Sequence, residues 1–144
     1  MMSILLTACG GIKHELQFTR SKPQESDLIG LWVPTPNTLK DMEKTGGYVI
    51  SKHEILLKED GTFSMINMPD WWRDGFGDSK KGFESSEGRW ELTQTQDWTK
   101  IWDITLHFSG YGTSVKLLGQ KPPYRIHIYV GDPDSGHVML FEKK

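Results

Sequence analysis

The residues best suited to recognition chemistry lie in one aromatic and basic stretch. Trp71, Trp72, Arg73 and Phe76 fall within residues 69–85, a glycine-containing segment without helical or strand periodicity. Aromatic side chains beside an arginine are typical of binding hot spots, and long irregular loops in small domains are often functional. Two interpretations stay open: at least one indole lies at the surface and binds, or the aromatic side chains fold over the core and complete it.

Other reactive side chains form no catalytic or metal-binding pattern. Asp132 and Asp134 are spaced like the start of a calcium loop, but the later ligands are missing and a Pro-Asp-Ser-Gly turn explains them better. No serine occupies a G-x-S-x-G elbow. The histidines lack ligand spacing such as H-x-x-x-H: His14, His53, His107, His127 and His137. We therefore expect a non-enzymatic protein without a metal or other cofactor.

Alternating apolar and polar residues predict the elements that position these side chains. Residues 101–108 and 124–130 alternate with a period of two, which places His107 and His127 on polar, solvent-facing sides. Asp60-Gly61 predicts a tight turn between two further strands. The remaining predictions are strands at 29–33, 48–57, 62–67, 88–93, 113–118 and 137–142, and a short helix at 38–44. About eight strands joined mostly by short turns predict an all-β fold, an antiparallel up-and-down barrel.

Two Gly-x-Trp units carry a family resemblance. The segment Asp27–Trp32 opens the first strand with Gly-Leu-Trp, residues 60–63 read Asp-Gly-Thr-Phe, and residues 88–90 repeat Gly-x-Trp. This pattern resembles lipocalins and the wider calycin group, in which the first Gly-x-Trp closes one end of a barrel. It is similar above all to bacterial lipoproteins with lipocalin-like domains.

The same resemblance gives Cys9, the one cysteine of the chain, a role. Leu6-Thr7-Ala8-Cys9 resembles the bacterial lipobox, whose cysteine is acylated after the preceding segment is removed. The acyl chains then anchor the protein, and each buried CH₂ contributes about 0.8 kcal/mol. Gly10 after the cysteine, in place of aspartate, would allow sorting to the outer membrane, and we expect the protein to lie there and face the periplasm. Residues 1–8 are expected to be the remnant of a truncated signal peptide, and residues 9–26 the lipidated cysteine and a flexible tether.

Residues 27–144 are then expected to form one barrel domain, in line with the length of 144 residues. The net charge of −2 gives no footprint for nucleic acid, and the sequence contains no basic run suited to an anionic membrane. Lipocalins carry an arginine near the last strand and a Thr-Asp-Tyr turn; this chain offers only Lys143 and Lys144 and lacks that turn. We therefore expect an envelope-protein partner bound through the aromatic stretch, with a small apolar or amphipathic ligand inside the barrel as the alternative.

Overall fold

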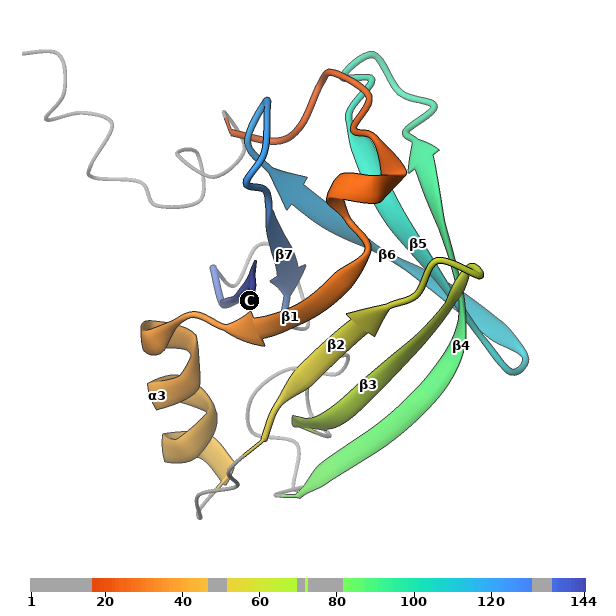
Figure 1. Ribbon diagram of the computed structural model, residues 1–144. Coiled ribbons are helices and arrows are strands. Elements are labelled where there is room, and N and C mark those ends of the chain that lie inside the picture. The colour runs from red at the N-terminus through yellow and green to blue at the C-terminus, as the bar shows by residue number, and fades with distance from the viewer. Residues whose placement is uncertain (1–16, 47–51, 70–71, 73–81, 131–135) are drawn as a thin grey trace, which may run out of the picture.

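The computed structural model describes residues 17–46, 52–69, 72, 82–130 and 136–144, and these form a closed antiparallel barrel (Figure 1). Eight strands follow one another in chain order, and β1 pairs with β8 to close the barrel. The all-β up-and-down prediction is confirmed. The elements are η1 (Glu25–Asp27), β1 (Gly30–Pro34), α3 (Pro36–Gly46), β2 (Glu54–Leu57), β3 (Thr62–Pro69), β4 (Phe83–Gln94), β5 (Trp102–Phe108), β6 (Tyr111–Leu118), β7 (Arg125–Tyr129) and β8 (Val138–Lys143).

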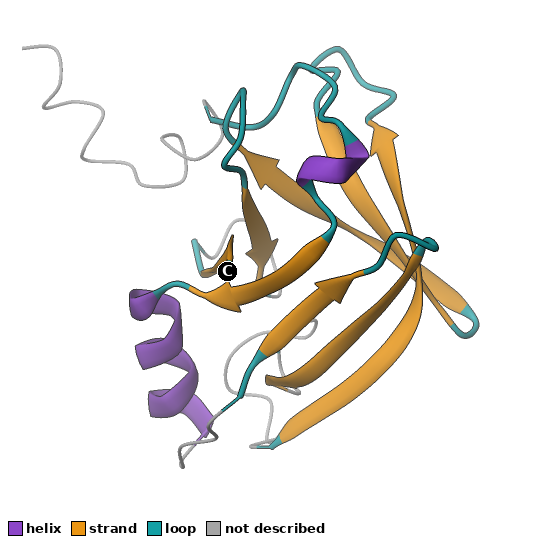
Figure 2. Ribbon diagram, viewed as in Figure 1, coloured by secondary structure: helices purple, strands orange, loops and turns teal. Residues whose placement is uncertain are grey.

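The up-and-down order gives the barrel two ends. At one end, here called the base, lie the segment before β1, the β2–β3 turn, the β4–β5 loop and the β6–β7 loop. At the other end, the mouth, lie α3, the end of β3, the β5–β6 turn and the end of β7. Figure 2 shows α3 beside the strands. Among the described residues, no helix has the length and apolar character needed to cross a bilayer.

The predicted helix at 38–44 is confirmed as α3, which starts two residues earlier. Its start follows from local sequence, because Pro36 fits the first turn of a helix and the Thr35 hydroxyl accepts the backbone N–H of Thr38 at 3.4 Å. The Thr38 hydroxyl in turn accepts the backbone N–H of Leu140 on β8 at 2.9 Å. Met42 is fully buried, so α3 covers the barrel wall with an apolar contact as well.

The first Gly-x-Trp unit closes the base. The Trp32 ring is fully buried, and its indole N–H donates to the carbonyl of Leu28 at 2.9 Å. Gly30 has a φ of +135°, and a Cβ there would lie 2.8 Å from Cε of Lys143. Lys143, whose Cα pairs with that of Trp32, crosses this glycine and donates to the carbonyl of Asp27 at 3.2 Å. A cation on the last strand therefore lies across the first-strand unit, although the sequence offers no arginine there.

The second unit needs its glycine for a different reason. A Cβ on Gly88 would lie 2.0 Å from the carbonyl oxygen of His107 on β5, so any side chain would force β4 and β5 apart. Trp90 packs into the same core, and its indole N–H donates to the carbonyl of Lys58 in the β2–β3 turn at 2.9 Å. Both indoles thus bond to backbone carbonyls at the base.

The folded part begins earlier than the boundary predicted at residue 27. Phe18 and Thr19 are buried, and the segment inserts into the barrel wall where β5 and β6 diverge. The Thr19 N–H donates to Leu117 at 3.0 Å, and the Trp102 N–H donates to the Thr19 carbonyl at 2.8 Å. The polar composition of residues 10–26 predicted a flexible tether throughout, which is wrong from residue 17 onward because backbone pairing needs no apolar periodicity.

Buried side chains from all eight strands fill the barrel interior. Trp32, Phe63 and Phe141 are the largest fully buried side chains. One connected cluster of buried residues runs from base to mouth and includes Ile55, Leu57, Met65, Met68, Trp90, Ile104, Leu106, Val115, Leu117, Ile126, Ile128 and Met139. Small eight-stranded barrels are often filled by side chains in this way.

Candidate functional site

The barrel wall is split between β6 and β7 near the mouth. Pairing of these strands is confined to Lys116–Leu118 of β6 and Arg125–His127 of β7. On its other side, β6 pairs with β5 from Lys116 as far as Tyr111. Among the described strands, residues 112–115 therefore pair with β5 but not with β7, and this part of β6 is a strand edge inside an otherwise closed barrel.

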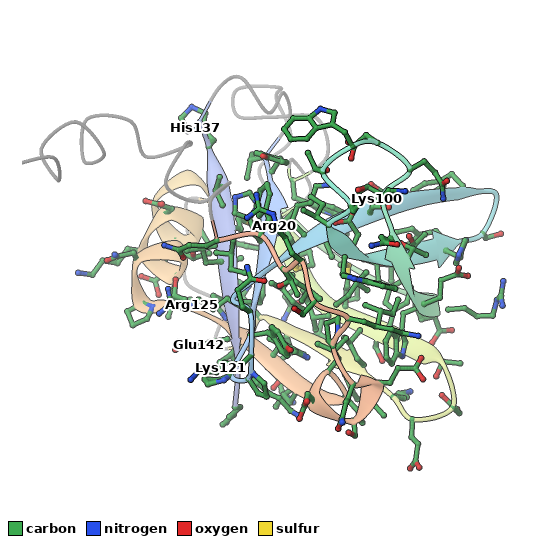
Figure 3. All side chains as sticks on the ribbon, turned by 90° about the horizontal axis from the view of Figure 1, so that it is seen from above. Arg20, Lys100, Lys121, Arg125, His137 and Glu142 are labelled. Atoms are coloured by element: carbon green, nitrogen blue, oxygen red, sulfur yellow. The ribbon has the colours of Figure 1, made fainter. Side chains whose placement is uncertain are left out.

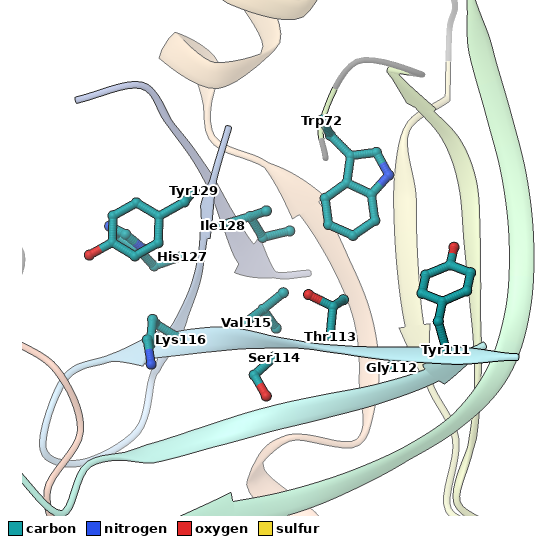
Figure 4. A pocket seen from close by; sticks show the side chains of 10 residues that line it. All are labelled: Trp72, Tyr111, Gly112, Thr113, Ser114, Val115, Lys116, His127, Ile128 and Tyr129. Atoms are coloured by element: carbon teal, nitrogen blue, oxygen red, sulfur yellow. The ribbon is translucent and has the colours of Figure 1, made fainter. Parts of the chain in front are cut away.

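A groove of about 290 Å³ lies along this split (Figure 4). Val115 and Ile128 form its apolar wall from the two strands, and Trp72 forms part of it from the segment after β3. Tyr111, Gly112, Thr113, Ser114, Lys116, His127 and Tyr129 complete the lining. The site thus combines this strand edge with a small apolar depression.

Trp72 is the one predicted binding residue within the described part of the chain. Its side chain is only 4% exposed and belongs to the central core cluster, so it follows the second interpretation, an aromatic residue that completes the core. It still reaches the groove wall. Trp71, Arg73, Phe76 and Cys9 lie outside the described residues.

An aromatic chain of contacts connects the groove to the core. The Tyr111 ring stacks on Phe108 at 4.9 Å with an interplanar angle of 10°, and Phe108 meets Phe63 edge-on at 5.2 Å. Tyr111 itself is 45% exposed. Sequence reasoning missed Tyr111 because a tyrosine beside a turn glycine is ordinary in a hairpin, and only the unequal pairing of β6 makes it part of a site.

An ion pair supports the closed part of the same wall. The Lys116 ammonium donates to Oδ2 of Asp103 at 2.9 Å, and Asp103 is buried. Burial raises the pKa of Asp103, and the neighbouring Lys116 only partly offsets that effect. Lys116 is thus held by a cross-strand partner on β5 at the point where pairing with β7 begins.

Three of the described histidines make contacts that fit a structural role. His127 is 1% exposed, although the alternation of β7 predicted a solvated side chain; that prediction is wrong because Phe18 covers its outer face edge-on at 5.2 Å. The His53 ring shares a hydrogen bond with the Asn67 carbonyl at 2.7 Å, and His107 lies 3.0 Å from Glu91. Within the described residues, no three histidine, cysteine or acidic side chains gather as metal ligands do.

Comparisons with protein-family models, curated proteins and solved structures find no match for this chain, so its function has to be argued from the residues and the geometry.

Proposed function

We propose that this protein is an envelope lipoprotein, anchored through an acylated Cys9, whose barrel binds a protein partner along the β6 edge at the mouth. The observation that carries the proposal is the edge itself: among the described strands, residues 112–115 pair with β5 only, beside a groove bounded by Trp72 and the half-exposed Tyr111. An exposed strand edge presents backbone N–H and C=O groups that an extended peptide can pair with. The adjoining apolar depression gives such a peptide a place for one side chain.

The filled interior supports a peptide bound at the surface over a small molecule buried inside the barrel. The groove itself measures about 290 Å³, near the lower end of the range of about 300–1,000 Å³ for ligand pockets. The described interior is filled by Trp32, Phe63, Phe141 and their neighbours. The proposal includes Trp71, Arg73 and Phe76 because they neighbour Trp72 in the sequence.

A second candidate is a small apolar or amphipathic ligand in the same groove. The observation that favours it is the apolar wall of Trp72, Val115 and Ile128. Such a ligand would quench or shift indole fluorescence at Trp72, so a Trp72→Phe variant would lose that signal. A peptide that pairs with β6 depends instead on the backbone edge and on Tyr111.

Site-specific cross-linking in cells tests the protein-partner proposal. A photoreactive phenylalanine analogue replaces Tyr111 at the mouth or, as the control, exposed Glu59 in the β2–β3 turn at the base. We expect one cross-linked protein from position 111 and none of that mass from position 59. With the purified partner, Tyr111→Ala should weaken binding about tenfold or more, the range of a hot-spot residue.

Folding of the variant provides the second readout. Because Tyr111 is 45% exposed, Tyr111→Ala should lower the melting temperature by only about 1–3 °C. Trp71→Ala and Arg73→Ala should likewise weaken binding of the partner without unfolding the barrel. Equal cross-linking from both ends, or partner binding that survives Tyr111→Ala, would overturn the proposal.

A further inference from the structure

The base of the barrel carries the most exposed large apolar side chain of the described residues. Trp98 is 89% exposed, in the β4–β5 loop. The loop around it is ordered: Oδ1 of Asp97 accepts the backbone N–H of Thr99 and the hydroxyl of Thr95, both at 3.0 Å. The Thr95 N–H also donates to the Ile101 carbonyl at 2.8 Å and closes the loop. A folded loop therefore holds this indole in solvent.

The same end exposes Lys58 and Arg125 and the carboxylates Glu25, Glu59, Asp60 and Asp97. Four further exposed cations at this end come from three separate segments: Arg20, Lys22, Lys100 and Lys121. We call these four residues the basic rim. Figure 3 looks down on the base and places Arg20 between Lys100 on one side and Lys121 and Arg125 on the other. Among the described residues, no carboxylate forms an ion pair with any member of the rim.

Backbone contacts of the inserted segment bring the rim together. Thr19 bonds to the start of β5, immediately after Lys100 and Ile101. The Arg20 N–H donates to the side-chain oxygen of Gln120, the neighbour of Lys121, at 2.9 Å. Lys22 lies over the ring of Trp102 with its ammonium 5.5 Å from the ring centre. The insertion of residues 17–20 between β5 and β6 thus joins charges that lie up to a hundred residues apart.

The proposed lipid anchor lies close to this end along the chain. Only residues 10–16 separate Cys9 from Gln17, where the segment meets the base. Eight Cα–Cα steps of about 3.5 Å give a maximum reach of about 28 Å. An acylated Cys9 would therefore keep the point where the chain enters the base within about 28 Å of the bilayer.

We infer that Trp98 and the basic rim form a docking face for the anionic surface of a phospholipid bilayer. Tryptophan favours the interface between lipid and water, and lysine and arginine near an anionic surface each strengthen partitioning about fivefold. Both lie on the end that the chain tethers. This inference rests on the proposed lipid anchor for its orientation, and it directs the β6–β7 groove away from the membrane.

Vesicle binding without the anchor separates the two ideas. The full chain with Cys9→Ser is mixed with phosphatidylcholine vesicles, or with vesicles of about one-third phosphatidylglycerol, and sedimented at about 0.1 M salt. We expect partitioning only onto the anionic vesicles. The double variant Arg20→Glu, Lys100→Glu should weaken it about twentyfold or more. Trp98→Ala should weaken it several-fold, whereas Tyr111→Ala, the matched aromatic control at the mouth, should leave it unchanged.

Each outcome decides one of the two proposals. The docking face is overturned if neither the charge reversal nor Trp98→Ala changes partitioning onto anionic vesicles, or if the protein binds neither kind of vesicle. Either result overturns it even if the mass of the membrane-extracted wild-type protein includes acyl chains on Cys9. An unmodified Cys9 combined with rim-dependent vesicle binding overturns the anchor and supports the docking face. Equal partitioning of the Tyr111→Ala and Trp98→Ala variants onto anionic vesicles would also overturn the docking face.

Discussion

Replacing Phe18 by alanine tests whether residues 17–20 belong to the barrel wall. Phe18 is 7% exposed and packs with Ile101 and Leu118 on the outside of the barrel. Burying a phenylalanine contributes about 1.5–3 kcal/mol, and its edge-on contact with His127 adds about 0.5–1.5 kcal/mol. Phe18→Ala should therefore lower the free energy of unfolding by about 3 kcal/mol, near the lower limit for buried phenylalanines.

Urea unfolding followed by far-ultraviolet circular dichroism measures this loss of free energy. In thermal unfolding, the melting temperature of a domain of this size should fall by about 6–12 °C. Trp98→Ala is the control, because a larger aromatic side chain that is 89% exposed should cost less than about 0.5 kcal/mol. If Phe18→Ala were as stable as the control, the segment would only rest on the barrel, and the predicted boundary at residue 27 would be restored.

Two further predictions concern the wall. Gly88→Ala should cost about 2–3 kcal/mol in thermal or urea unfolding because its Cβ meets the His107 carbonyl at 2.0 Å, whereas Gly112→Ala, with 3.4 Å to its nearest neighbour, should cost under about 1 kcal/mol; equal losses would contradict the close approach of β4 and β5. Burial raises the pKa of Asp103 in the folded state despite Lys116, so the ionised carboxylate lowers stability above that pKa and the penalty disappears as the pH falls through it. The stability of Asp103→Asn relative to wild type should therefore become more favourable between pH 4 and pH 7, and the opposite trend would mean that the ion pair outweighs burial.

Much of the barrel could be predicted from the sequence because its signals are local. The alternation in residues 101–108 and 124–130 and the Asp60-Gly61 turn fix strands and a hairpin without knowledge of the partner strands. The closed base was predicted differently, from the resemblance of the two Gly-x-Trp units to lipocalins. The sequence shows that Gly88 is present, but only its 2.0 Å distance to the β5 backbone explains why it has to be glycine.

The candidate site could not be predicted in the same way. The edge at residues 112–115 exists because β6 extends beyond its pairing with β7, which is a property of two strands and their register. Trp72 was singled out from the aromatic composition of its segment, but its burial is a tertiary property because the core cluster around it comes from several strands. Tyr111 has no distinctive local sequence at all.

The sequence by itself determined the strand order, the tight turn, the two indole units and the absence of any basic run. The tertiary structure alone decided the charge distribution at the base, where Arg20, Lys100 and Lys121 meet because the inserted segment pairs with β5 and β6. The physical reason is range. Periodicity and turn propensity act over a few residues, whereas a strand edge or a cluster of charges depends on which distant segments exchange backbone hydrogen bonds.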